Sequence, residues 1–370
     1  MGDLIDVVDR EANEESSWCW SELPYNLKKD VLACLPVEYL ARFSAVCNEW
    51  NALFSSTKFI TNRWAKAIPN RKPLLILLSA NCKSPCETYC FYTQTWKSFI
   101  SFNFLQEEES LHYHGSVAGL FLLSVRPYSN APTYHVCNPL TRTSLQLPPM
   151  LSFQAVSSMG IYNCGQNKKI YKVVAVGPQN IEIYDSSTSA WRVAGQVPAN
   201  LWGFDDKLII CNGICYGLAR FRSYNEYAIM GFNIADGTSN FASLPLETQN
   251  LSWMLEMDPQ LLTCGSKVLV VGGISEEDQQ HLVIWEFQSN SFSWAEIARM
   301  PQLMFDTISI SFSIRCVGVE DNVCIIGEGK AVSAVYNLNQ NSWGWLPDFY
   351  LYHPLDSIMS FEPRLDVNLR

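Results

Sequence analysis

The sequence predicts a small all-α module followed by an all-β propeller of six blades. Between residues 23 and 54, apolar side chains recur at helical spacing, whereas from Lys72 to the end of the chain short β-rich runs alternate with turn residues. Within the β-rich part, one pair of positions recurs at a period of about 50 residues. We expect an acidic disordered tail at residues 1–17, the helical module at 18–64, a linker at 65–71 and the propeller at 72–370.

Composition bounds the class of protein. The length of 370 residues allows two or three domains, and 48% apolar with 13% aromatic residues suffices for a large core. No apolar run approaches the ~18 residues of a membrane helix, and acids stand where a secretory signal would be basic and then apolar. The 13 Cys, without C-x-x-C spacing, favour reduced thiols. We expect residence in the nucleus, the cytoplasm or both, and no membrane partner.

The net charge of −10 is distributed unevenly along the chain. Residues 1–17 carry −5, residues 18–70 carry +2, and the remainder therefore carries −7. A nucleic-acid footprint would need a basic face, so we expect no direct nucleic-acid partner. The tail lacks a periodic apolar pattern, and for this reason we interpret it as a disordered, solvating leader.

Two Leu-Pro pairs mark helix starts in the helical module. Pro24 and Pro36 stand where helices can begin, because a fixed φ and a missing N–H are tolerated in a first turn. One apolar stripe per helix follows: Leu27, Val31 and Leu35; Leu40 and Phe43; Val46, Trp50 and Leu53. Such short helices bury too little surface for a self-sufficient core, so the surplus apolar surface indicates docking.

The same stretch resembles the F-box, the module that ties a substrate receptor to the Skp-type adaptor of a cullin ubiquitin ligase. The resemblance rests on Leu23-Pro24, Val31-Leu32, Leu35-Pro36, Leu40, Arg42-Phe43, Val46-Cys47 and Trp50, which occur in order at family spacing. It implies an adaptor and, through it, a cullin as partners. The residues expected to contact the adaptor are Leu23, Pro24, Val31, Leu32, Leu35, Pro36, Leu40, Val46, Cys47 and Trp50. Some of these must instead be buried within the module.

A large residue followed seven positions later by an aromatic residue marks the repeat. The pairs are Tyr89…Trp96, Tyr184…Trp191, Ile234…Phe241, Phe287…Trp294 and Tyr336…Trp343, with a weaker copy at Cys137…Ser144. Their second members are 48, 47, 50, 53 and 49 residues apart, which predicts six blades. Only three strands precede Glu107, so we expect Ser357–Pro363 to be the inner strand of the first blade and to close the ring. The recurrent Trp residues are expected to pack between blades.

The repeats resemble those of the kelch family in its degenerate plant F-box/kelch form. The features that carry the resemblance are Gly272-Gly273, the stretch Asn138–Pro149 and the ending Phe361-Glu362-Pro363. With the F-box, it covers about residues 20–370. It implies a kelch-type propeller that serves as the recognition platform of a ubiquitin ligase.

Signals of catalysis are poor. The sequence has no G-x-S-x-G, H-E-x-x-H, P-loop or G-x-G-x-x-G motif. The nearest metal-like group is Cys82, Cys86 and Cys90 with His112 and His114, but its x3 spacing lacks the tight thiolate turn of a zinc site. Five His in the chain also disfavour a copper-oxidase propeller, and Asp236-Gly237 is typical of a turn. We expect neither an enzyme nor a cofactor or metal.

A candidate binding face lies between the blades. Five connections that follow a Pro and lead into the next blade carry bulky apolar residues: Pro149–Met159, Pro198–Asp206, Pro245–Met257, Pro301–Thr307 and Pro347–His353. In a propeller these connections share one rim, which would suit recognition of a protein segment. The candidate target-binding residues are Phe153, Trp202, Phe204, Arg220, Arg222, Tyr224, Trp253, Met304, Phe305 and Tyr350. The alternative, weighed equally, is that some of them begin an inner strand and belong to the core.

Two functions follow from these patterns. In the first, the protein is the substrate-recognition subunit of an SCF-type (Skp–cullin–F-box) ubiquitin-protein ligase, with an unknown target protein on the propeller rim. In the second, it is a non-degradative interaction scaffold or transcriptional co-regulator that uses the propeller alone. The sequence does not name the target or say whether a small molecule or a modification gates its recognition.

Overall fold

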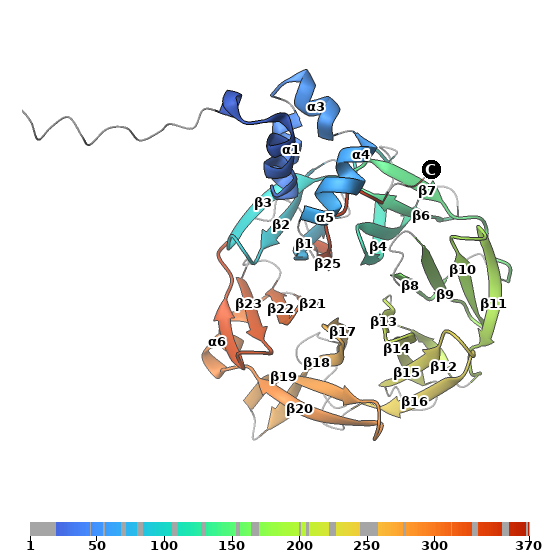
Figure 1. The fold of residues 1–370 in the computed structure, drawn as a ribbon. Coiled ribbons are helices and arrows are strands. Elements are labelled where there is room, and N and C mark those ends of the chain that lie inside the picture. The colour runs from blue at the N-terminus through green and yellow to red at the C-terminus, as the bar shows by residue number, and fades with distance from the viewer. Residues whose placement is uncertain are drawn as a thin grey trace, which may run out of the picture. The chain divides into compact units, whose positions relative to one another are not determined.

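The computed structural model divides the chain into two compact units, Met1–Asn70 and Arg71–Arg370 (Figure 1). We describe each unit by itself. The structure describes residues 20–44, 46–54, 56–67, 72–79, 84–105, 110–126, 131–152, 156–163, 170–199, 201–204, 207–221, 227–244, 258–276, 279–311, 313–327, 332–349, 355–367 and 369. The expected disordered tail at 1–17 lies outside these residues.

The N-terminal unit is helical. After a 3-10 turn η1 (Trp20–Glu22), it contains α1 (Tyr25–Ala33), α2 (Val37–Ser44), α3 (Asn48–Phe54), α4 (Thr57–Phe59), the π-helical turn η2 (Ile60–Trp64) and α5 (Ala65–Ala67). The three helices that the sequence predicts are α1, α2 and α3. Pro24 is the N-cap of α1, in agreement with its expected place at a helix start. The segment from α4 to α5 is additional and was not expected to be helical.

The C-terminal unit is a six-bladed propeller, as the sequence predicts (Figure 1). Blade 1 contains β25 (Leu355–Phe361), β1 (Leu74–Ser79), β2 (Cys86–Cys90) and β3 (Thr95–Ile100); blade 2 contains β4 (Ser110–Val117), β5 (Leu120–Arg126), β6 (Thr133–Asn138) and β7 (Thr143–Gln146). Blade 3 contains β8 (Ser158–Asn163), β9 (Tyr171–Val176), β10 (Asn180–Asp185) and β11 (Ala190–Gln196).

Blade 4 has its inner strand in two pieces. It contains β12 (Leu201–Phe204), β13 (Ile209–Cys211), β14 (Ile214–Phe221), β15 (Tyr227–Asn233) and β16 (Ser239–Ser243). Blade 5 contains β17 (Gln260–Cys264), β18 (Lys267–Glu276), β19 (Gln279–Gln288) and β20 (Ser293–Arg299), and the helix α6 (Gln302–Ile308) leads from it to blade 6. Blade 6 contains β21 (Ile314–Val319), β22 (Asn322–Gly327), β23 (Val332–Asn337) and β24 (Ser342–Trp345).

The two ends of the propeller meet in blade 1, as expected. The last strand, β25, pairs antiparallel with the first, β1, from Leu74↔Phe361 to Leu78↔Ser357. The stretch after β25 is fastened to blade 2, because the Asn138 Nδ2 donates to the carbonyls of Arg364 (2.9 Å) and Val367 (2.7 Å). Closure thus joins strands that are far apart in the sequence and protects both their edges.

The repeat marks the outer hairpin of each blade. Tyr89↔Trp96, Tyr184↔Trp191, Phe287↔Trp294 and Tyr336↔Trp343 are direct cross-strand pairs, as is the weak copy Cys137↔Ser144. Two residues before each second member, the chain takes a positive φ, at Gln94, Arg142, Ser189, Phe292 and Asn341. This conformation turns the chain between the two paired strands.

The predicted pair Ile234…Phe241 in blade 4 is wrong by two residues. Phe241 pairs with Met230, and the partners at the repeat's position are Phe232↔Ser239. The positive φ of Gly237 (77°), two residues before Ser239, confirms this register. A Cβ at Gly237 would lie 2.6 Å from the Ala194 carbonyl oxygen, so the turn requires glycine for space as well as for conformation.

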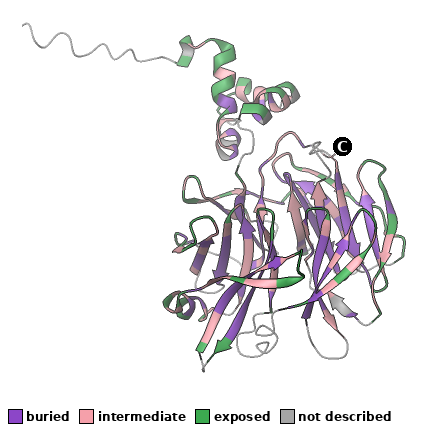
Figure 2. Cartoon of the chain, turned by 60° about the horizontal axis from the view of Figure 1, so that its bottom comes forward, coloured by how far each residue is buried: buried purple, intermediate pink, exposed green. Residues whose placement is uncertain are grey.

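The propeller core lies between neighbouring blades, and Figure 2 shows the buried residues along the interior of the sheets. Separate apolar clusters fill the interfaces of blades 1 and 2, 2 and 3, 3 and 4, 4 and 5, 5 and 6, and 6 and 1. Three Trp residues of the repeat also donate their indole N–H across an interface, each at 2.8 Å. The bonds run from Trp96 to Pro347 O, from Trp191 to Pro148 O and from Trp294 to Ser243 O.

Candidate functional site

The structure sorts the predicted adaptor-binding residues of the helical unit by exposure. Leu32 and Leu40 are each 3% exposed and belong to the core of the unit, so their prediction as surface contacts is wrong. The exposed members are Pro24, Val31, Val46 and Cys47, and the half-buried members are Leu23, Leu35, Pro36 and Trp50. A contact surface for another protein can therefore involve eight of the ten, while the other two maintain the fold that presents them.

The exposed apolar residues of α1 form one stripe on its surface. Leu27 is 51% and Val31 is 48% exposed, and they lie one turn apart, next to the exposed Pro24. The opposite side of the helix is buried at Leu32 and Ala33. Leu27 and Tyr25 (51% exposed) were not among the predicted contacts, although the i, i+4 spacing of Leu27 and Val31 already placed these two on one face.

Contacts from the additional helical segment fix α1 in place. The Arg63 guanidinium in η2 pairs with the Asp30 carboxylate and donates to the carbonyl of Asn26 at 3.1 Å.

Trp50 of α3 packs edge-on against Trp20, Phe43 and Phe54, with ring centroids 5.8, 5.3 and 6.4 Å apart. This aromatic cluster gives Trp50 a structural role, whatever it contacts outside the unit.

Eight of the ten predicted target-binding residues of the propeller fall into three groups. Phe153, Arg222, Tyr224, Trp253 and Tyr350 lie outside the described residues, as does the side chain of Trp202. Phe204 is half-buried and packs on the cluster between blades 3 and 4. Arg220 stacks on the Tyr227 ring at 4.6 Å from its centroid and pairs with Asp258 at 3.3 Å. Arg220 is therefore held in place by its own neighbours.

The prediction for Phe305 is wrong. The connection after Pro301 forms α6 rather than the start of a strand, and α6 buries Phe305 (4% exposed) and Ile308 in the core between blades 5 and 6. Met304 is partly buried against the same core. The apolar residue that α6 exposes instead is Leu303, which is 83% exposed.

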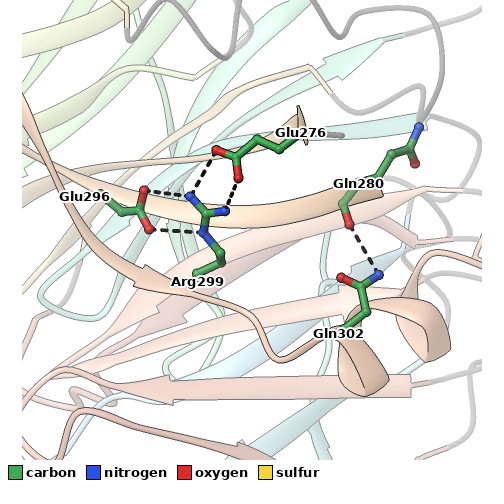
Figure 3. A network of polar contacts seen from close by, with 5 residues as sticks. All are labelled: Glu276, Gln280, Glu296, Arg299 and Gln302. Atoms are coloured by element: carbon green, nitrogen blue, oxygen red, sulfur yellow. Dashed lines mark hydrogen bonds and ion pairs between the residues drawn. The ribbon is translucent and has the colours of Figure 1, made fainter. Parts of the chain in front are cut away.

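Polar contacts hold α6 and the long β18–β19 hairpin together at the outer edge of blade 5 (Figure 3). The Arg299 guanidinium lies between Glu276 (2.6 Å) and Glu296 (3.2 Å), and its hydrogen bond holds the pKa of Glu276 below its usual value. Gln302 of α6 donates to the Gln280 carbonyl at 3.4 Å. These contacts keep the connection between blades 5 and 6 against the hairpin.

The inner strands enclose a central channel. Each of β25, β4, β8, β13, β17 and β21 contacts the inner strands of both neighbouring blades. The cavity they surround has a volume of about 870 Å³, large enough for a small ligand or a peptide side chain. Lys207 lines it, and so do Glu320 and Glu362, the latter two at positions where β21 and β25 have ended. The channel thus has chemically different ends.

The described thiols and carboxylates show no metal site. Burial raises the pKa of the Cys86 and Cys264 thiols to about 12, so both stay protonated. Among the described residues, no three His, Cys, Asp or Glu side chains come together in a way that could hold a metal ion. None of the described helices is long and apolar enough to span a membrane.

A helical unit with an exposed apolar stripe, followed by a closed six-bladed propeller, defines a two-part interaction protein. The F-box associated beta propeller domain family matches residues 101–355, and the F-box domain matches residues 20–62. The chain belongs to the F-box associated beta propeller domain family, in its plant F-box/kelch form.

Curated relatives agree with this assignment. The chain is 26% identical over 312 residues to F-box only protein 6 of Arabidopsis thaliana, a match covering 82% of this chain and 63% of that protein. It is 24% identical over 395 residues to an F-box/kelch-repeat protein of Arabidopsis thaliana, covering 97% of this chain and 93% of that protein. A chain from a nidogen/laminin complex is similar in structure with a TM-score of 0.48 at 9% identity, covering 80% of this chain and 100% of that one.

Proposed function

We propose that the protein is the substrate-recognition subunit of an SCF-type ubiquitin-protein ligase. The F-box binds the Skp-type adaptor, and through it a cullin, while the propeller binds the target protein. The observation that carries the proposal is the exposed apolar surface of the F-box, formed by Leu27, Val31 and Val46 (51%, 48% and 64% exposed). Full burial of each such side chain contributes about 1.5–3 kcal/mol, so a partner that covers them gains substantial affinity.

The propeller supports the second half of the proposal by its construction. The connections that lead into the inner strands bury a few residues between the blades, such as Phe305 and Phe349, but their exposed residues are not needed to fill the core and can vary. The subunit performs no bond chemistry in this proposal. It holds the target near a ubiquitin-loaded enzyme, and the assembly accelerates transfer because the reaction becomes effectively intramolecular.

The test is affinity purification of the full-length protein and of Val31→Asp/Val46→Asp under proteasome inhibition, with mass spectrometry of both eluates. Both positions are exposed, so the double variant should fold while placing charge in the contact surface. We expect adaptor and cullin with the unchanged protein and a loss of about tenfold or more with the variant. Lys58→Asp, a charge change at an exposed position of α4, is the matched control and should retain the adaptor.

Two results would overturn the proposal. If the variant retains the adaptor at the level of the Lys58→Asp control, the exposed apolar surface formed by Leu27, Val31 and Val46 is not the contact surface. If the unchanged protein recovers neither adaptor nor cullin but recovers other partners through the propeller, the protein is an interaction scaffold that acts without degradation.

A further inference from the structure

Three basic side chains and one carboxylate meet at one end of the central channel. His112, Arg315 and Asp356 are near the first residues of the inner strands β4, β21 and β25, which belong to blades 2, 6 and 1. Lys207 stands between β12 and β13, the two pieces of the inner strand of blade 4. Because inner strands begin at the face that receives the connections from the preceding blades, this end of the channel opens on the candidate binding face. We call it the channel mouth.

Direct contacts tie the channel mouth together. The His112 Nδ1 lies 3.6 Å from the Asp356 Oδ1, and the Arg315 guanidinium donates to the Leu355 carbonyl at 3.4 Å. The Lys207 ammonium donates to the Ser357 hydroxyl. Blades 1 and 4 face each other in the ring (Figure 1), so the Lys207 side chain reaches across the channel to do this.

The backbone of blade 4 is shaped to place Lys207 there. β12 pairs with β14 from Leu201↔Phe221 to Phe204↔Ala219, and β13 pairs with it from Ile209↔Tyr216 onward. Between the two pieces the ladder is interrupted, and Lys207 instead forms an isolated bridge to Met159 of blade 3. A continuous inner strand would give more ladder hydrogen bonds.

The carboxylate at the mouth is unusual for its surroundings. Burial raises the pKa of Asp356 although His112, Arg315 and Lys207 all act to lower it. The side chain of Asp356 is 18% exposed and that of His112 is 42% exposed, so the group is partly buried yet still reachable from solvent. A titratable group perturbed by burial and close to Lys207, which lines the cavity, is a candidate for a functional site.

The connections between blades, which reach the same face, have an acidic sequence. The six connections between blades contain no Lys or Arg. Three acids fall in residues 101–109, two (Asp205 and Asp206) in 197–206, three in 244–259 and one each in 300–313 and 346–354. The sequence of these connections is therefore acidic, whereas three of the four described side chains at the channel mouth are basic. An anionic ligand would be attracted at the centre of this face and repelled around it.

We infer that the channel mouth, formed by His112, Lys207, Arg315 and Asp356, binds a single anionic group of the target, a carboxylate or a phosphate, whose neighbours are neutral or basic. The inference deepens the proposed function and rests on it. Among the described groups of the channel mouth, Lys207 and Arg315 supply cationic side chains and Asp356 supplies one carboxylate. The Lys207 ammonium moves from Ser357 to the ligand, and the Arg315 guanidinium supplies paired donors to two oxygens.

Three pools of short fluorescent peptides test this inference on the full-length protein. The central residue is Asp, phosphoserine or Ala, and the flanking positions are randomised over neutral and basic residues. We expect the protein to retain the Asp pool, the phosphoserine pool or both about tenfold more than the Ala pool, since charge-assisted hydrogen bonds are involved. Retention of the Asp pool alone identifies a carboxylate, and retention of the phosphoserine pool alone identifies a phosphate.

Variants separate the channel mouth from general charge effects. Lys207→Met/Arg315→Gln should bring retention down to that of the Ala pool, while Lys207→Arg should keep most of the preference. Arg299→Gln removes a positive charge at the outer edge of blade 5 and is the matched control, expected to keep the preference. In the unchanged protein, added salt should reduce the preference, a readout that needs no variant.

The inference is overturned if the unchanged protein retains all three pools equally, or if a folded Lys207→Met/Arg315→Gln protein keeps the preference. Adaptor recovery from the same preparations distinguishes this failure from that of the proposed function. If the unchanged protein does not recover the adaptor, the ligase proposal is wrong. The peptide preference depends only on the propeller, so it can hold or fail independently of adaptor recovery.

Discussion

The two units of the chain bury their apolar residues to different extents for their sizes. In the F-box, Tyr25, Leu27, Val31 and Val46 are between 48% and 64% exposed, although the unit is small. In the propeller, apolar clusters fill the six interfaces between blades and the chain ends are paired to each other. The difference indicates where each unit gets its stability: the propeller from its own closed core, and the F-box partly from a partner that covers its surface.

The strongest way to break this comparison is to open the propeller. Removal of residues 355–370 deletes β25, whose Leu355, Ile358, Met359 and Phe361 are at most 5% exposed. Loss of these four buried side chains removes about 6–12 kcal/mol of burial energy, which is comparable to the whole stability of a domain. We expect the propeller to lose cooperative thermal unfolding, as measured by circular dichroism. A cooperative transition in the truncated chain would show that closure is not needed.

A single interface can be weakened without opening the ring. Trp191 is 7% exposed and donates to the Pro148 carbonyl, so Trp191→Ala should lower the free energy of unfolding by about 3–5 kcal/mol. Trp191→Phe keeps one aromatic ring but loses the indole N–H and the volume of the five-membered ring. We expect a smaller loss than with alanine, of which about 0.5–1.5 kcal/mol comes from the hydrogen bond. Chemical denaturation measures both. Trp345 is 48% exposed, and Trp345→Ala should change stability by no more than about 0.5 kcal/mol.

Two neighbours on α1 sharpen the comparison within the F-box. Leu32 is 3% exposed and Val31 is 48% exposed. Leu32→Ala should lower the local stability of the unit by about 2–5 kcal/mol, whereas Val31→Ala should change it by at most about 0.5 kcal/mol while weakening adaptor binding. Amide hydrogen exchange of α1 and α2 in the full-length chain measures the local stability. Equal effects of the two substitutions would contradict the division of α1 into a core side and a contact side.

The smallest expected effect concerns Asp356, a carboxyl group in the closing strand that lowers the stability of the propeller when it is ionised. Burial raises the pKa of Asp356 in the folded protein above its ordinary value of 3.8, so ionisation of this carboxyl destabilises the fold. That loss is absent below the ordinary pKa and grows as the pH rises through the folded-state pKa. Asp356→Asn should therefore gain thermal stability relative to the unchanged protein as the pH rises above about 4, the ordinary pKa of an aspartate. A difference in melting temperature that does not vary with pH would refute this.

The elements with local signals could be predicted from the sequence. Pro24 and Pro36 mark the starts of α1 and α2, and the recurring pairs mark the outer hairpins, because turn chemistry and cross-strand pairing act over few residues. The closing strand could be predicted by counting strands, because the first repeat has three strands and a blade needs four. In blade 4 the predicted register is wrong because the prediction takes Phe241 as the second member of the pair for its aromatic ring. The turn at Gly237 makes Ser239 the second member instead.

The candidate sites were less predictable, because exposure depends on contacts between distant residues. Phe305 and Leu303 are both apolar residues of one connection, but α6 buries the first and exposes the second, and only the position of the helix on blades 5 and 6 decides this. The contact of Lys207 with Ser357 joins residues 150 positions apart, with no signal at either residue. Leu32 and Val31, adjacent in the sequence, could be separated only once the packing partner of α1 was known.

The pairing of β25 with β1 also sets an order of events during protein synthesis. The ribosome makes the F-box first and the strand that closes the propeller last, and domains that emerge early can fold early. A messenger RNA with a premature stop codon before Leu355 would therefore encode an intact F-box joined to an open ring. If the F-box binds the adaptor as proposed, such a product would occupy ligase complexes without presenting a target. A truncated allele would then interfere with the normal gene copy rather than merely fail to replace it.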